Sequence, residues 1–275
     1  MIVLEKGHQK LLDTPAAMDI LGVGIVSITE INSNLIYNKG ISRSLMNDLI
    51  KLYRSDILKK KEGKIIDLLG ILTVSIHFYS FKDECIAIFY VIEKDTLTNY
   101  NDMCSVSKSL AQLYCSNAPL TTINKVCTKM IPNFEGLSAL FVVSTTGHTL
   151  FTKIRDDKTS ILENHIQIGG FLSAILMFSN EVLGKHSEDT LQSINLKNDR
   201  FIIFVKEDII FAYLIDHSFK SENFQRYIEL IAEEFLDQFR EKVKNFNGDL
   251  GQFHLFDSVI DKYFGFESAH LKIYK

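Results

Sequence analysis

The sequence contains no tryptophan, and it has only three prolines and four cysteines in 275 residues. No two cysteines form a C-x-x-C motif, and no cysteine or histidine recurs at the spacing of zinc ligands. Neither a metal nor another cofactor is therefore expected. All four cysteines, at positions 85, 104, 115 and 127, lie in apolar stretches, which predicts buried and reduced thiols.

Positive charge is not concentrated on the chain as a whole. The formal net charge is −4 and the pI is about 6.1. No nucleic-acid partner is expected, because binding to phosphates needs a concentrated basic face. The one basic run, Lys59–Lys61 followed by Lys64, lies among acidic residues and is interpreted as a solvated loop. Contact of this run with an anionic membrane or partner is the alternative.

Long apolar runs are also missing. The longest uncharged one, from Ile168 to Phe178, is far below the ~20 residues that a membrane-spanning helix needs. The first ten residues, MIVLEKGHQK, carry charge where a signal peptide would be apolar. We therefore expect a cytoplasmic protein with no integral membrane segment, an expectation that leaves peripheral contact with a membrane open.

No catalytic motif is present. Residues 144–149 (STTGHT) place Ser144 and His148 four residues apart, but the sequence offers neither a group to orient the histidine nor an oxyanion hole. The phosphate-binding loop and the dinucleotide fingerprint are absent as well. His148 is interpreted as an exposed turn residue and the chain as a protein that is not an enzyme. A hydrolase that uses Ser144 and His148 is kept as an alternative.

One pattern occurs twice in the chain. Residues 22–39 (GVGIVSITEINSNLIYNK) and 136–153 (GLSALFVVSTTGHTLFTK) each consist of a glycine, an apolar run, a polar turn and a short second run that ends in lysine. A constant offset of 114 positions aligns Lys39 with Lys153. Because Asn, Gly and Ser supply turn geometry between β-rich runs, both segments are predicted to be β-hairpins.

The same order of elements follows each hairpin. A helical pattern comes first, at residues 42–54 in one half and at about 160–183 in the other. The β-rich runs then cover residues 64–81 and 84–92 in the first half, and 191–196, 200–206 and 208–216 in the second. Two helical patterns close each half, at 95–115 and 121–130 and at about 224–241 and 253–264.

This order, β-β-α-β-β-β-α-α, predicts an α+β protein, an α/β sandwich made of two domains. Each domain is expected to be an antiparallel five-stranded meander sheet packed with helices. The predicted boundary lies near Pro132, so that residues 1–132 and 133–275 form the two domains.

The helix after the second hairpin is apolar on every side. A helix that lies on a sheet with its other face in water should show only one apolar stripe. Something is therefore expected to cover the outer face of residues 165–178 (HIQIGGFLSAILMF), either the closing helices of the same domain or another domain or subunit. The candidate interface residues are Ile168, Phe171, Leu172, Ile175 and Phe178, with Leu45 and Leu49 on the equivalent helix of the first half.

The element order, the apolar helix and the tandem repeat together resemble the longin family of profilin-like domains. The segments FLSAILMFSNEVLG (171–184), LQSINLKNDRFIIFVKEDIIFAYLID (191–216) and FNGDLGQFHLFDSVIDKYF (246–264) are similar to longin-type proteins of Asgard archaea. The related roadblock fold, which begins with a helix, is the alternative for the second domain.

The resemblance implies a function in binding. Longin-like domains pair through the first helix and the neighbouring strand edge, and paired domains dock small GTPases and in some assemblies accelerate nucleotide exchange. We therefore expect an interaction platform for a Ras-like GTPase, as an exchange factor or as a subunit of a trafficking-type regulatory complex. Its domains would pair with each other or with another chain. A PAS-like sensor of a small ligand is the alternative, although residues 42–54 look like one continuous helix.

Overall fold

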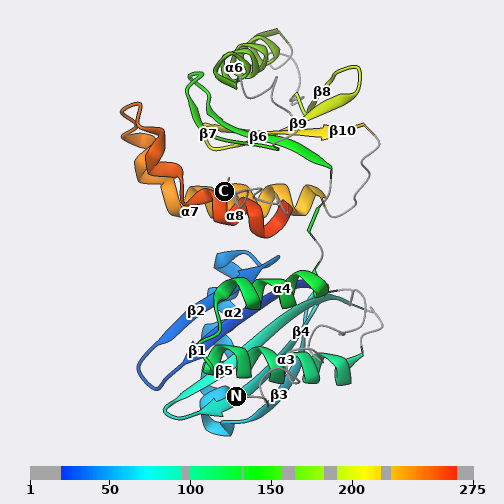
Figure 1. Cartoon of the computed structure of the whole chain (residues 1–275), viewed down its shortest axis with the longest axis vertical. Helices are drawn as coiled ribbons and strands as arrows, with labels where there is room; N and C mark the ends of the chain where they lie inside the picture. The colour runs from blue at the N-terminus through cyan, green and yellow to red at the C-terminus, as the bar shows by residue number, and fades with distance from the viewer. Residues whose placement is uncertain are drawn as a thin grey trace, which may run out of the picture. The chain divides into compact units, whose positions relative to one another are not determined.

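The computed structural model describes residues 20–94, 99–131, 133–134, 136–155, 165–182, 191–217 and 224–264. The chain divides into two compact units, Met1–Asn133 (unit 1) and Phe134–Lys275 (unit 2). Each unit is an antiparallel five-stranded sheet packed with helices, and both follow the order β-β-α-β-β-β-α-α (Figure 1). The predicted fold class is therefore confirmed.

The elements of unit 1 are β1 (Ile20–Ile28), β2 (Ser33–Lys39), α2 (Arg43–Lys60), β3 (Gly63–Leu69), β4 (Leu72–Phe81), β5 (Glu84–Glu93), α3 (Tyr100–Cys115) and α4 (Leu120–Met130). Those of unit 2 are β6 (Leu137–Ser144), β7 (Thr149–Ile154), α6 (His165–Val182), β8 (Ser193–Asn195), β9 (Asp199–Lys206), β10 (Ile209–Asp216), α7 (Phe224–Lys244), the short 3-10 turn η1 (Leu250–Phe253) and α8 (Phe256–Phe264).

The strand order departs from a continuous meander at one point in each sheet. The orders are β2-β1-β5-β4-β3 and β7-β6-β10-β9-β8. The last three strands of each unit do form a meander, but the first strand pairs with the last one. The reason is the connection between the second and third strands. It contains the first helix and carries the chain from one edge of the sheet to the other.

The two predicted hairpins are present, and four residues connect the strands in each, 29–32 and 145–148. Their closing hydrogen bonds differ, because the Thr29 amide donates to the Asn32 carbonyl at 2.8 Å, whereas the Ser144 amide donates to the His148 carbonyl, also at 2.8 Å. Gly147 adopts a positive φ of 92° in the second tip, a conformation that favours glycine. The STTGHT segment is therefore a hairpin tip, as predicted from its alignment with the first half.

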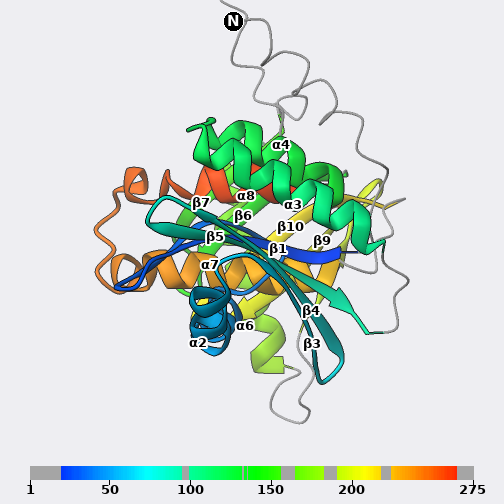
Figure 2. The same ribbon diagram turned by 90° about the horizontal axis from the view of Figure 1, so that it is seen from below.

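Helices cover both faces of each sheet. In unit 1, α2 packs on one face, where Met46 and Leu49 belong to the same core as Val74 and Phe89, and α3 and α4 lie on the other (Figure 2). In unit 2, α6 packs on one face through Leu172, and α7 and α8 lie on the opposite one (Figure 1). Alternate residues of each strand face the two helical layers, which explains why the central strands are apolar throughout.

The aligned lysines Lys39 and Lys153 make the same kind of link in the two units. Each lies on the second strand of its hairpin and reaches the final segment of its unit. Lys39 is fully buried, and its ammonium donates to Asn133 Oδ1 at 2.6 Å. The Lys153 ammonium lies 2.9 Å from Asp257 Oδ1 and 3.1 Å from Asp261 Oδ1 on α8. The sequence offset thus aligned positions with one structural role.

Helix α2 corrects the interpretation of the basic run. Ser42 caps the helix by accepting a hydrogen bond from the Leu45 amide, and the helix continues past Arg54 to Lys60. Lys59 and Lys60 therefore lie in its last turn, where cations interact favourably with the partial negative charge of the helix end. Lys61 ends the helix with a φ of 63°. Residues 59–61 are exposed, as predicted, but Lys59 and Lys60 belong to a helix and not to a loop.

The prediction of four buried thiols is only half right. Cys85 and Cys127 are buried, but Cys104 is exposed and Cys115 is partly exposed, and none of the four forms a disulfide. The last two lie on α3, whose buried face is formed by other residues, among them Met103, Leu110 and Ala111. None of the helices in the described part of the chain is long and apolar enough to cross a membrane.

Candidate functional site

Helix α6 presents two apolar faces. Its inner face enters the core of unit 2 through Leu172, which is fully buried, and Leu176. Its outer face exposes 48% of Phe171, 63% of Met177 and 66% of Phe178. We call Phe171, Ala174, Met177 and Phe178 the α6 outer face. No charged residue occurs between His165 and Asn180, so this face has no ionic protection from association.

The closing helices of unit 2 do not cover the α6 outer face. Helices α7 and α8 pack on the opposite face of the sheet, where Phe235 meets Phe211 and Phe256 meets Phe151 (Figure 1). The alternative in which α6 is covered by its own closing helices is therefore wrong. Its exposed phenylalanines and methionine are available to another surface.

Close packing positions α6 on the sheet. An added Cβ at Gly169 would lie 2.2 Å from Thr149 Oγ1, so only glycine allows this approach to β7. One turn later the Ser173 hydroxyl donates to the Thr145 carbonyl at 2.8 Å. This bond joins the helix to the STTGHT tip. Because both contacts are specific to one rotation of the helix, they fix which residues point outward.

The equivalent helix of unit 1 has a different outer face. Only one large apolar side chain on α2 is strongly exposed, Leu52 at 58%, and its neighbours Asp48, Lys51 and Ser55 are polar. Leu49 is buried in the core of unit 1, and Leu45 is partly buried against it. An uncovered apolar helix face is therefore a property of unit 2.

The structure separates the predicted interface residues into two groups. Phe171 and Phe178 are exposed, and Ile168, Ile175 and Leu45 are partly buried. Leu172 and Leu49 are core residues of their own units and are not accessible to a partner. Met177 completes the exposed face but was not predicted, because a helix that is apolar all round does not reveal which side faces the sheet.

The STTGHT tip forms a short chain of hydrogen bonds. The Ser144 and Thr146 hydroxyls lie 2.7 Å apart, and Thr146 Oγ1 lies 3.0 Å from His148 Nδ1. Ser144 Oγ also accepts from the His148 backbone amide at 3.1 Å. The Thr146 hydroxyl therefore stands between the serine and the imidazole, which is not the direct contact that would activate a serine nucleophile.

The side chain of His148 packs against an aromatic residue. Its ring makes an edge contact with Phe246, with ring centroids 6.1 Å apart, on the segment that follows α7. The same tip is bound to α6 through Ser173. The tip thus joins the two helical layers of unit 2, and this packing accounts for its residues.

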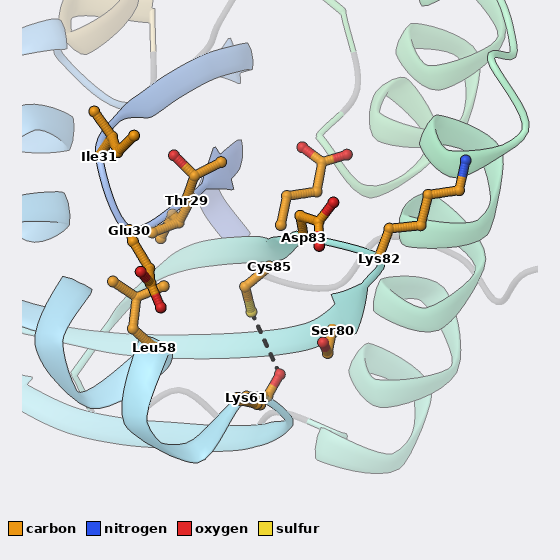
Figure 3. A pocket seen from close by; sticks show the side chains of 11 residues that line it. Thr29, Glu30, Ile31, Leu58, Lys61, Ser80, Lys82, Asp83 and Cys85 are labelled. Atoms are coloured by element: carbon orange, nitrogen blue, oxygen red, sulfur yellow. Dashed lines mark hydrogen bonds between the residues drawn. The ribbon is translucent and has the colours of Figure 1, made fainter.

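A cavity of about 600 Å³ opens at the hairpin end of unit 1 (Figure 3). It lies between the β1–β2 tip, the end of α2 and the β4–β5 turn. Cys85 points into it, and its thiol donates to the Lys61 carbonyl at 3.4 Å. Burial raises the pKa of Cys85 to about 11, so the thiol is protonated at neutral pH and is a poor nucleophile.

The charges around this cavity are mixed. Glu30, Asp83 and Glu84 supply carboxylates, while Lys61 and Lys82 supply ammonium groups. The Glu84 carboxylate also accepts a hydrogen bond from the Ser27 hydroxyl. No cluster of His, Cys, Asp and Glu in the described residues is arranged to hold a metal ion. The cavity therefore shows no preference for an anion or a cation.

No known protein family matches this chain, and no curated protein matches it either.

A buried serine–histidine pair lies beneath α3 and was not anticipated. Ser75 Oγ is 3.2 Å from His77 Nε2, and both residues are buried. Burial, together with the charge of Lys64, lowers the pKa of His77 to about 4, so its imidazole is neutral near pH 7. Because helix α3 covers the sheet above this pair, no substrate can reach it, and it is a polar element of the core. No sequence motif marked it, since the pair arises from simple alternation along β4.

Proposed function

We propose that this protein is a non-catalytic interaction platform that binds a Ras-like small GTPase through two longin-type domains. The tandem arrangement of two units with the same element order supports the assignment to longin-type domains. The α6 outer face carries the proposal, because it is an uncharged apolar surface on the helix through which such domains pair. In this role the protein acts as an exchange factor, or as a subunit of a trafficking-type regulatory complex.

Burial of the α6 outer face would contribute part of the energy of a specific contact. Full burial of one large apolar side chain contributes about 1.5–3 kcal/mol relative to full exposure. Phe171, Met177 and Phe178 each leave roughly half to two thirds of their surface in water. Covering all three would therefore contribute roughly 3–5 kcal/mol before the entropic cost of association.

An edge strand with exposed apolar side chains in unit 1 adds support. Strand β3 is the last strand of its sheet, and Ile66 and Leu68 on it are exposed. An edge strand with exposed apolar side chains favours pairing with another strand. A strand edge is one of the elements that longin-type pairing uses.

The alternative of a PAS-like sensor has less support. Between their second and third strands PAS domains usually carry several short helices, whereas α2 is one continuous helix of 18 residues. Its inner face, formed by Met46, Leu49 and Tyr53, packs directly on the sheet. We therefore prefer the platform.

The test is calorimetric titration of the full chain against a panel of Ras-like GTPases, combined with measurement of nucleotide release. We expect saturable binding to at least one GTPase. The Phe171→Asp and Phe178→Asp variants should lose at least tenfold in affinity for the partner that binds the α6 outer face. The matched control is Leu52→Asp on α2, which should bind like the unchanged protein. The absence of binding and of accelerated release across the panel would refute the proposal.

A further inference from the structure

A second cavity lies on the other face of unit 1, between α3 and the ends of β4 and β5. It has a volume of about 410 Å³, within the range of sites for small organic molecules. Its apolar surface comes from Tyr79, Phe81 and Ile86 on the strands and from Ala111 on α3. We call this cavity the α3 groove.

The closing helix of unit 2 shows why side chains do not fill the α3 groove. On the corresponding face of unit 2, Phe235 of α7 packs on Phe211 with ring centroids 5.7 Å apart. Helix α7 also continues for 21 residues and pairs Arg240 with Glu207 at the strand turn. Helix α3 ends after 16 residues and presents the small side chain of Ala111. The same architecture is thus filled in one unit and hollow in the other.

Polar groups line one rim of the α3 groove in a regular row. Lys108 and Gln112 on α3 and Ser116, the residue that ends the helix, lie four residues apart and all border the cavity. Side chains at this spacing lie on one face of a helix. Among the described residues that line the groove, Lys108 is the only cationic side chain, and it makes no ion pair with another described residue. The one carboxylate, Glu62, borders the groove from the segment before β3.

We propose that the α3 groove binds a small amphiphile with an apolar body and a carboxylate group. The body lies on Tyr79, Phe81 and Ala111, and the carboxylate lies on the α3 rim, where the Lys108 ammonium and the Gln112 amide donate hydrogen bonds. Glu62, on the segment before β3, repels the carboxylate, so the ligand has one favoured orientation.

Binding at this groove is non-covalent. Cys115 borders the cavity, but burial raises the pKa of its thiol above the ordinary value, and the nearby Glu84 charge acts in the same direction. A protonated thiol is a weak nucleophile. The inference does not depend on the proposed GTPase platform, because it concerns another unit and another surface.

The experiment compares three probes of equal chain length by isothermal titration of the full chain: octanoate, octanol and octylamine. We expect saturable binding of octanoate at one site, about fivefold weaker binding of octanol, and the weakest binding for octylamine. The factor of five corresponds to one partly exposed ion pair. Binding of octanoate without saturation, or equal binding of all three probes, would overturn the proposal.

Variants assign the binding to the groove. Lys108→Gln should remove the preference for octanoate over octanol, and Lys108→Glu should reverse it in favour of octylamine. Ala111→Phe should abolish binding by filling the cavity, while Phe171→Ser on α6 should change nothing. Because Lys108 is exposed, its variants will fold even if Ala111→Phe does not. A charge preference that survives Lys108→Glu, or full binding by a folded Ala111→Phe variant, would contradict the site.

Discussion

Two buried tyrosines offer a sharp test of how hydrogen bonding stabilises the two units. Tyr90 on β5 and Tyr213 on β10 both face the closing helices and are fully buried. The Tyr90 hydroxyl lies 2.9 Å from Ser107 Oγ, whereas Tyr213 has no hydrogen-bond partner among the described residues. The perturbation is the same in both units: Tyr90→Phe and Tyr213→Phe remove one oxygen each.

The structure predicts opposite signs for the two changes. The Ser107 hydroxyl donates to the Met103 carbonyl at 2.6 Å, so the Tyr90 hydroxyl must be the donor to Ser107. Its loss should cost about 1 kcal/mol, the net value of a typical hydrogen bond. Removing the unpaired hydroxyl of Tyr213 relieves a desolvation penalty of about 1–3 kcal/mol, less the small void that the missing oxygen leaves. We expect Tyr213→Phe to stabilise unit 2 by about 1 kcal/mol.

The assay is urea denaturation followed by far-ultraviolet circular dichroism, with hydrogen exchange to assign each change to β5 or β10. The two variants should differ by roughly 2 kcal/mol in the free energy of unfolding of their units. A Tyr90→Phe/Ser107→Ala double-mutant cycle should return a coupling of about 1 kcal/mol. If Tyr213→Phe destabilises unit 2 by as much as Tyr90→Phe destabilises unit 1, the reasoning fails, because Tyr213 then has a partner such as an ordered water.

Three further predictions concern single positions. Lys61→Gly should stabilise unit 1 by roughly 0.5–1 kcal/mol in thermal denaturation, because Lys61 has a φ of 63°, a conformation that favours glycine. The control is Lys59→Gly inside the same helix, which should destabilise unit 1 by about 1 kcal/mol. Equal effects of the two changes would contradict this prediction. Gly170→Ala should stabilise α6 by up to about 1 kcal/mol, since nothing lies near its added methyl group, but Gly169→Ala should destabilise by roughly 1–2 kcal/mol through contact with Thr149. His77 is neutral in the fold and has a pKa of about 4 against 6.5 in the unfolded chain, so only the unfolded state binds the proton between these values. The free energy of unfolding should therefore fall by up to about 3 kcal/mol as pH decreases from 6.5 to 4, and a His77→Gln variant should lose that dependence.

Much of the fold could be predicted from local patterns in the sequence. The hairpins follow from apolar runs separated by turn residues, and the repeat aligned Lys39 with Lys153, which make the same link in the structure. The order of strands in the sheets could not be read in this way. Pairing of β1 with β5 joins segments about sixty residues apart, and no local pattern records which of several apolar strands lies in the centre.

The candidate interface on α6 stays a prediction, but the structure shows which of its residues are accessible. The apolar character of α6 indicated that something covers its outer face, and Phe171 and Phe178, two of the candidate residues, are exposed. Leu172, a candidate interface residue, lies in the core instead. Because every face of the helix is apolar, the spacing of its apolar residues does not indicate which side faces the sheet. The rotation of the helix about its axis is fixed by contacts with distant segments, namely Gly169 against Thr149 and Ser173 against Thr145. These contacts depend on tertiary packing, which a single sequence does not display.

The two units agree wherever the architecture makes a physical demand. Both turns that lead into the last strand place a non-glycine residue at positive φ, with 53° at Lys82 and 54° at Glu207. A tight turn between antiparallel strands requires this backbone geometry, whatever the side chain. Such shared features stabilise the fold and say nothing about what the protein binds.

The units differ at two places where the architecture makes no such demand. One is the outer face of the first helix, which is polar on α2 but carries Phe171, Met177 and Phe178 on α6. The other is the space beneath the closing helix, which is filled by Phe235 in unit 2 and left hollow beside Ala111 in unit 1. An exposed apolar face and an unfilled groove both reduce the stability of an isolated domain, since each forgoes apolar contacts. In each case the other unit of the same chain lacks the feature, so the fold requires neither the exposed apolar face nor the groove. A partner on α6 and a ligand under α3 would each restore the missing contacts, so binding function is best sought at these two surfaces.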